Sequence, residues 1–261
     1  MPADAGIVAL EAAAVGADLA AAVGTDLAAA ALTLARRFAA GATMWCVSPR
    51  WPAHSRHLAV EFVHPVVVGT RALPAVHVEA ADVVGAVRLL ARPGDVVAVV
   101  GPGDDDLVRD LLRRADPWGL TSVWIGAGPR PPAGLADHVL WNGGADAGIA
   151  ARSGDIVVLY HLLWELTHVV FEHPGLLRDA TAGACTDDVC ITCSDEGRLA
   201  EVTAAGPGSR AEVLAGGHRE TVDVTLVEPV TPGDLVLVHA GVAIAKVDSA
   251  GAAGNVGALA R

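Results

Sequence analysis

The sequence predicts an α/β protein with a doubly wound parallel-sheet domain over residues 1–180 and a small five-stranded OB-like β-barrel over residues 189–250. In the first part, apolar strand-like runs alternate with helical segments, which is typical of a parallel sheet wrapped by helices. After Gly197 the apolar period changes to two, and the turns become rich in glycine and proline, which is typical of a small barrel. The length of 261 residues suits two domains better than one.

The first domain is expected to begin with two helices in residues 5–40, separated near Gly24, where Thr25 or Asp26 would cap the second. The other expected helices are Ala53–Val63, Ala81–Ala91, Asp104–Ala115 and Asp155–Phe171. The expected strands are Ala42–Ser48, Val66–Val68, Ala75–Val78, Asp95–Val100, Thr121–Ile125 and His138–Trp141. Because Asp95–Val100 is continuously apolar after its first residue, we expect it in the middle of the sheet, covered on both faces.

A linker over residues 173–188 separates this domain from the second. The second domain is expected to consist of five short strands: Arg198–Thr203, Arg210–Leu214, Glu220–Leu226, Leu235–His239 and Val242–Val247. Gly206-Pro207-Gly208, Gly216-Gly217 and Pro232-Gly233-Asp234 supply turns between them.

Composition excludes several classes of function. The net charge is −12 and both domains are acidic, so neither offers a basic surface for nucleic acid. The first residues carry Asp4 and Glu11 and no basic residue, unlike a secretory signal. No uninterrupted apolar run reaches about 18 residues, so we expect no membrane span. The four cysteines, three of them clustered, do not resemble a disulfide scaffold. We therefore expect a cytoplasmic protein.

Cys190 and Cys193 stand just before the barrel, and His239 lies on an apolar strand inside it. Thiolate and imidazole ligands suit iron and zinc, and a Cys-x-x-Cys turn can place both sulfurs on one ion, with Cys185 nearby. The alternatives are a redox pair or reduced surface thiols, and a barrel histidine without a ligand.

The segment from Gly197 to Asp248 resembles the HypC/HupF family of [NiFe]-hydrogenase formation chaperones. The resemblance rests on Gly197-Arg198-Leu199-Ala200-Glu201-Val202, on Val224–Val230, and above all on Pro232-Gly233-Asp234-Leu235-Val236-Leu237-Val238-His239-Ala240-Gly241-Val242-Ala243-Ile244. It implies that a cysteine and His239 hold iron, which gains cyanide and carbon monoxide ligands on a HypD-type scaffold protein. It also implies contact with the hydrogenase large subunit. Family members usually begin Met-Cys, whereas the cysteines here are internal, and the motif does not choose between Cys190 and Cys193.

A second group of metal-ligand types lies in the first domain. His57 and Glu61 are four residues apart on one helix face. His161, Glu165 and His168 share a face of the last helix of this domain. If the two helices meet, these residues can bind Zn²⁺ or Fe²⁺. The alternative is that the histidines bond to Glu165 or to a dimer partner.

Residues 27–177 resemble SIS (sugar isomerase) domains of the sedoheptulose-phosphate isomerase branch, on His57-Leu58-Ala59-Val60-Glu61-Phe62, the Arg92–Val100 strand and the helix bearing His168. The resemblance implies metal ligands at His57, Glu61 and His168, with Tyr160 at a glutamine position, and a homo-oligomer. The ligand loops depart from the family: Ser48 and Arg50 lie in one, and Asp104 with two further aspartates lies in the other. Since carboxylates repel a phosphate dianion, we do not expect phosphosugar isomerisation.

The sequence therefore favours an accessory chaperone for [NiFe]-hydrogenase assembly, in which the first domain need not be catalytic. Two other hypotheses stay open: a metal-dependent enzyme acting on a small carbonyl or phosphosugar substrate, and a regulatory ligand-binding dimer.

Overall fold

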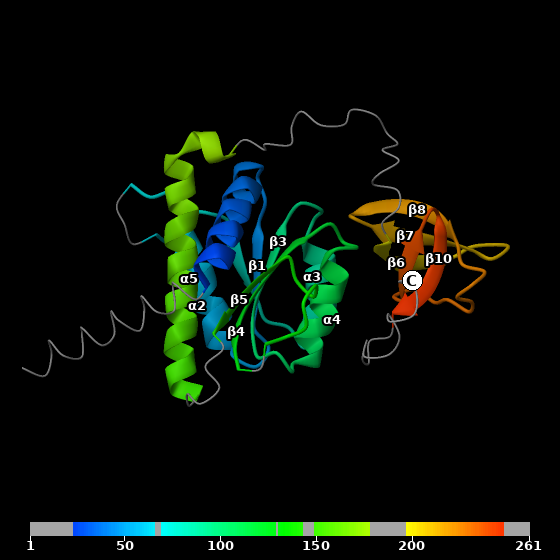
Figure 1. Cartoon of the computed structure of the whole chain (residues 1–261), viewed down its shortest axis with the longest axis horizontal. Helices are drawn as coiled ribbons and strands as arrows, with labels where there is room; N and C mark the ends of the chain where they lie inside the picture. The colour runs from blue at the N-terminus through cyan, green and yellow to red at the C-terminus, as the bar shows by residue number, and fades with distance from the viewer. Residues whose placement is uncertain (1–22, 66–68, 129, 143–148, 178–196, 248–261) are drawn as a thin grey trace, which may run out of the picture.

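The computed structural model describes residues 23–65, 69–128, 130–142, 149–177 and 197–247. Figure 1 shows a helix-covered sheet joined to a separate barrel. The predicted strand Val66–Val68 and the predicted ligands Cys190 and Cys193 lie outside the described residues, as does Cys185.

The first domain is a five-stranded parallel sheet in the order β2-β1-β3-β4-β5. Its strands are β1 (Met44–Val47), β2 (Ala75–Val78), β3 (Val96–Val100), β4 (Thr121–Ala127) and β5 (His138–Asn142). Its helices are residues 23–39, α2 (Pro52–Val63), α3 (Val83–Leu90), α4 (Asp106–Ala115) and α5 (Ile149–Glu172), followed by the short 3-10 helix η1 (Pro174–Leu177). The predicted doubly wound fold is confirmed.

The sheet is covered on both faces. Alternate residues of β3 point to opposite sides: Val96 and Ala98 pack with the helix over residues 23–39, α2 and α5, whereas Val97 and Val99 pack with α3 and α4. All five residues of β3 are fully buried, as the continuous apolar run predicted.

The predicted start of the helix that contains Leu27 was wrong. The helix over residues 23–39 already includes Gly24, Thr25 and Asp26, so neither polar residue caps it. Val23 and Leu27 are buried on one helix face in the core, and their burial favours continuing the helix through the glycine.

The helix α5 is 24 residues long and largely apolar. Within the part of the chain that the structure describes, Ser153–Glu172 is apolar and long enough to span a membrane by length and composition, which alone is weak grounds for a span. It packs against α2, β4 and β5, and 44% of it is buried. We therefore describe it as a core helix of this domain.

The second domain is a closed barrel in the order β10-β8-β7-β6-β9. Its strands are β6 (Arg198–Ala205), β7 (Arg210–Ala215), β8 (His218–Asp223), β9 (Leu235–His239) and β10 (Val242–Val247). The five predicted strands are all present, but β8 begins two residues earlier and ends at Asp223, where the Asp223 carboxylate accepts hydrogen bonds from the Thr225 backbone N–H and hydroxyl and stabilises a turn.

Asp95 ties the start of β3 to its neighbours. Its carboxylate, in a residue only 7% exposed, accepts hydrogen bonds from the Thr43 backbone N–H at 2.8 Å and from the Trp45 indole N–H at 2.9 Å. It also accepts one from the Arg92 backbone N–H at 3.0 Å. Three donors therefore depend on one side chain.

We predict that Asp95→Ala lowers the free energy of unfolding by about 2–4 kcal/mol, because three partly buried N–H donors lose their shared acceptor. Denaturant unfolding followed by circular dichroism measures this. Asp104→Ala, at a side chain that is 75% exposed, is the control and should change stability by less than about 0.5 kcal/mol. Equal effects of the two substitutions would contradict the role of Asp95.

Candidate functional site

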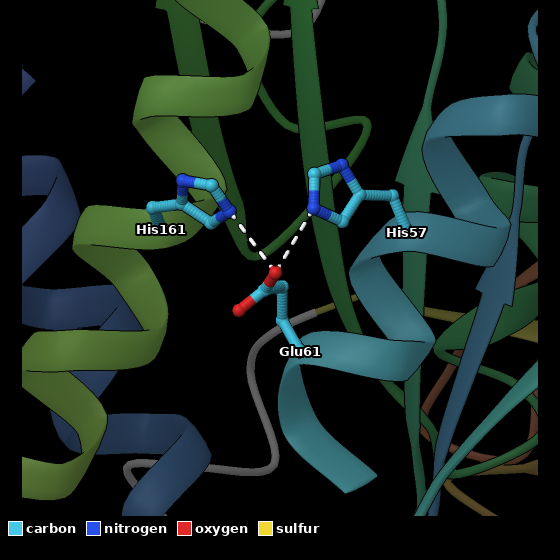
Figure 2. A group of neighbouring side chains, drawn as sticks. All are labelled: His57, Glu61 and His161. Atoms are coloured by element: carbon cyan, nitrogen blue, oxygen red, sulfur yellow. Dashed lines mark hydrogen bonds and ion pairs between the residues drawn. The ribbon is translucent and has the colours of Figure 1, made fainter. Parts of the chain in front are cut away.

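The helices α2 and α5 bring three of the predicted metal ligands together. His57 Nε2 lies 2.9 Å from Glu61 Oε1, and His161 Nε2 lies 3.3 Å from the same oxygen (Figure 2). The two imidazole rings are 5.2 Å apart at an angle of 81°. One ligand atom from each of the three residues lies within 4.8 Å of the others. The three side chains point toward a common centre between the helices.

This donor set fits a divalent metal ion. In a tetrahedral zinc site with bonds of 2.0–2.2 Å, donors are about 3.4 Å apart, so a small opening of the cluster admits an ion. The His161 Nε2 atom is buried, and apart from its 3.3 Å contact with Glu61 it has no hydrogen-bond partner among the described residues, which suits it to bind a metal ion. Two histidines and one carboxylate leave a fourth position open, as in catalytic zinc sites.

Tyr160 forms a hydrogen bond with the ring nitrogen of His57 that faces away from Glu61. Its hydroxyl lies 2.7 Å from His57 Nδ1. Burial, and to a smaller extent the charge of Glu61, raises the pKa of Tyr160, so the hydroxyl keeps its proton. The hydroxyl can donate to Nδ1 while Nε2–H donates to Glu61, or accept from Nδ1–H when Nε2 binds a metal. Tyr160 therefore suits both tautomers, as partners that orient a metal-binding histidine do.

His168 does not join this cluster. Its Nδ1 lies 2.8 Å from the Trp164 carbonyl oxygen and its Nε2 lies 2.9 Å from the Arg71 carbonyl oxygen. Both ring nitrogens are turned toward backbone acceptors, so His168 ties α5 to the loop before β2. His54 lies nearer to the cluster, with its ring 6.1 Å from that of Tyr160 and Nε2 2.9 Å from the Ser153 hydroxyl.

Sequence reasoning missed His54, although its spacing of three residues before His57 placed it on the same side of α2. Burial first, and then the neighbouring His57, lowers the pKa of His54. We therefore regard His54 as a neutral neighbour of the cluster that hydrogen-bonds Ser153.

The predicted ligand residues Ser48, Arg50 and Asp104 gather where β1 and β3 end, before α4. Arg50 contacts Asp104 at 3.4 Å and Asp105 at 3.2 Å. Asp105 is buried and its carboxylate accepts hydrogen bonds from the backbone N–H groups of Leu107 and Val108 at the start of α4. An anion that used this helix N-terminus would have to displace a carboxylate already seated there.

The Ser48 hydroxyl, which is buried and has no partner among the described residues, is the one group of this set left unsatisfied. Cys46 lies two residues earlier on β1 and is free and fully buried. Burial raises the pKa of its thiol, which keeps it protonated and unreactive.

His239 is the last residue of β9. Its neighbour Val238 pairs with Arg198, the first residue of β6, so His239 lies next to the point where the chain enters β6. Val236 and Val238 lie in the barrel core, whereas Leu237 and His239 belong to the alternate, outward set of β9. Gly197 is where the chain enters the barrel, four residues after Cys193.

Comparison with known proteins gives a family match for the barrel and structural neighbours for the first domain. Residues 197–259 match the HupF/HypC family. The phosphoheptose isomerase from Francisella tularensis superposes with a TM-score of 0.52 at 12% identity, over 65% of this chain and 99% of that one. The phosphoheptose isomerase from Neisseria gonorrhoeae gives 0.48 at 16% identity, over 63% and 95%. No curated protein matches the chain.

The fold and the two candidate sites thus define a two-module protein, a sheet domain joined to a closed barrel. Residues 197–259 match the HupF/HypC family, and the first domain has the fold of a phosphoheptose isomerase. At 12% identity the likeness of the first domain establishes its fold alone.

We predict that a variant lacking Cys190 and Cys193 still binds one Zn²⁺, and that His161→Ala in that background weakens binding by at least about 10-fold, because one of three ligands is lost. Isothermal titration calorimetry measures the affinity. His168→Ala is the matched control on the same helix and should leave zinc affinity unchanged while lowering stability. A loss of zinc affinity in His168→Ala equal to that in His161→Ala would refute this ligand set.

Proposed function

We propose that the chain is an assembly chaperone for [NiFe] hydrogenase that acts in the cytoplasm. In this proposal the barrel holds the iron fragment of the active site, with its cyanide and carbon monoxide ligands, through His239 and a thiolate of Cys190 or Cys193. It exchanges this cargo with a HypD-type scaffold protein and the hydrogenase large subunit. The observation that carries the proposal is the HupF/HypC match over residues 197–259, which includes His239.

The barrel geometry supports a cysteine–histidine pair at this corner. His239 follows Val238, which pairs with Arg198 at the start of β6, and the chain from Cys193 joins the barrel at that start. Four residues of extended chain span at most about 14 Å, and the seven from Cys190 span about 25 Å. Both thiols are thus within reach of the His239 corner, and the pairing does not need the N-terminal cysteine that family members usually have.

In the first domain, we propose that His57, Glu61 and His161 hold one Zn²⁺ or Fe²⁺ ion, and that the domain forms a homo-oligomer. The ion would supply Lewis acidity at its open position, while Tyr160 orients His57. Phosphosugar isomerisation is the alternative function. It is opposed by Asp105, whose buried carboxylate occupies the α4 N-terminus and pairs with Arg50.

We expect iron in protein purified without oxygen, and expect Cys190→Ala/Cys193→Ala and His239→Ala each to remove it. Elemental analysis per chain measures this, with His218→Ala as the control because His218 is an exposed histidine of the same barrel. A hydrogenase maturation assay with the same variants gives the functional readout. Iron content and maturation that persist in both the thiol and the His239 variants would rule the chaperone out.

We also predict no turnover of sedoheptulose 7-phosphate by the metal-loaded protein. The Asp105 carboxylate already accepts hydrogen bonds from the N–H groups at the start of α4, and its negative charge would repel the phosphate of the substrate. A coupled assay for the product measures this. Turnover that disappears in His57→Ala would instead establish the isomerase alternative.

A further inference from the structure

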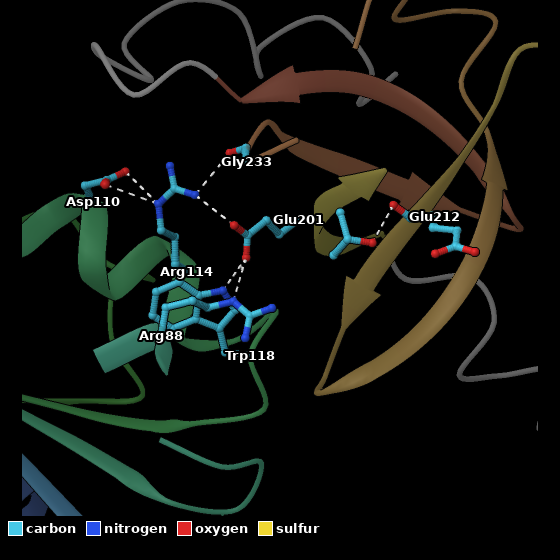
Figure 3. Close-up of polar contacts among 8 residues, drawn as sticks. Arg88, Asp110, Arg114, Trp118, Glu201, Glu212 and Gly233 are labelled. Carbon is cyan, nitrogen blue, oxygen red and sulfur yellow. Dashed lines mark hydrogen bonds and ion pairs between the residues drawn. The ribbon is translucent and has the colours of Figure 1, made fainter. Parts of the chain in front are cut away.

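The side chain of Glu201, on β6, points out of the barrel and contacts side chains of the first domain (Figure 3). Its carboxylate lies 3.3 Å from Arg114 of α4 and 3.7 Å from Arg88 of α3, and it accepts a hydrogen bond from the indole N–H of Trp118. The Glu201 side chain is only 11% exposed. A buried carboxylate is stable only when it is paired, and every partner shown here belongs to the other domain.

The receiving side chains are themselves held in place. Arg114 donates to both carboxylate oxygens of Asp110, at 3.1 and 3.2 Å, and to the carbonyl oxygen of Gly233 at 3.0 Å. The Arg88 guanidinium lies over the Trp118 ring, 5.5 Å from its centre. The pocket for Glu201 is therefore fixed by contacts within the first domain and by one turn of the barrel.

A backbone contact adjoins this pocket. The Gly217 N–H, in the turn between β7 and β8, donates to the Pro117 carbonyl oxygen at 2.9 Å. A Cβ atom on Gly217 would come within 2.7 Å of Pro93, so only glycine permits this approach. Leu214 of β7 packs within the apolar cluster that α3 and α4 form on the sheet.

A cleft of about 490 Å³ lies between the first domain and the barrel, beside these contacts. Asp116 and Asp137 line it from the first domain, and Gly197, Leu199 and Leu237 line it from the barrel. His239 lies two residues beyond Leu237 on the outward side of β9, at the margin of the same barrel face. The first domain therefore flanks the face to which the family histidine belongs.

We propose that Glu201 is an interdomain latch that fixes the barrel on the α3–α4 side of the first domain, so that the two modules move as one body. A partner protein that binds at His239 then also contacts the first domain beside it. The barrel does not move freely relative to the first domain when it delivers its cargo. This goes beyond the proposed function and holds whether or not the barrel carries a metal.

The test compares Glu201→Gln with Glu212→Gln. Glu212 is an exposed residue of the same barrel, 3.8 Å from Arg219, and it does not reach the first domain. Amide hydrogen exchange by nuclear magnetic resonance should show that Glu201→Gln reduces the protection of the Gly217 amide by about tenfold or more, while the Val213 and Val236 amides inside the barrel keep theirs. The Trp118 indole N–H signal should shift, and small-angle scattering should show a wider distribution of shapes. Glu212→Gln should change none of these.

Arg114→Gln removes a partner of Glu201 in the first domain. It should lower the hydrogen-exchange protection of the Gly217 amide as Glu201→Gln does. If Glu201→Gln also exposes Val213 and Val236, the barrel itself has loosened, and Arg114→Gln then decides. Unchanged protection of Gly217 in Arg114→Gln overturns the latch. So does a wild-type chain whose scattering already requires many relative domain positions.

Discussion

The structure depends on one constraint, which is that a parallel sheet with apolar residues on both sides must be covered on both faces. The residues of β3 alternate between two separate apolar clusters. The cluster under α2 and α5 sets those helices side by side, and their contact creates the group of His57, Glu61 and His161. The cluster under α3 and α4 fixes the positions of those helices. Arg88 and Arg114 on their outer side form ion pairs with Glu201 of the barrel.

The α4 N-terminus shows how a shared fold can carry a different site. Helix N-termini attract anions because their first N–H groups have no partner within the helix. Here a carboxylate of the chain itself, Asp105, accepts from two of these groups, and Arg50 neutralises it. The same physical preference that would bind a phosphate is thus satisfied internally. Sharing a fold with a phosphoheptose isomerase does not by itself imply the same chemistry.

Sequence predicted the elements well and the contacts between them only in part. The strands Leu235–His239 and Val242–Val247 were predicted at their observed bounds, because period two and glycine turns are local signals. The pairing of His57 with Glu61 is also local, since it follows from a spacing of four on one helix.

Which of His161 and His168 joins His57 and Glu61 could not be predicted from local sequence. Both lie on one side of α5, but seven residues of helix separate them by about 10.5 Å along the axis, so one ion cannot take both. The height at which α2 crosses α5 selects His161, and that height is set by packing between helices. The pocket for Glu201 is of the same kind: nothing in the sequence around Glu201 points to Arg88, Arg114 or Trp118, because they lie about 80 to 110 residues away.

The two faces of the sheet also keep the candidate metal sites apart. Figure 1 shows α5 and α2 at one end of the molecule and the barrel at the other, with the sheet, α3 and α4 between them. His57, Glu61 and His161 face the gap between α2 and α5, whereas His239 belongs to the barrel beyond α4. Because the sheet, α3 and α4 lie between them, the two candidate sites cannot share a single ion. Any influence of an ion in one site on the other would have to pass through the sheet, α3 and α4, and Glu201 connects the barrel to Arg88 of α3 and Arg114 of α4.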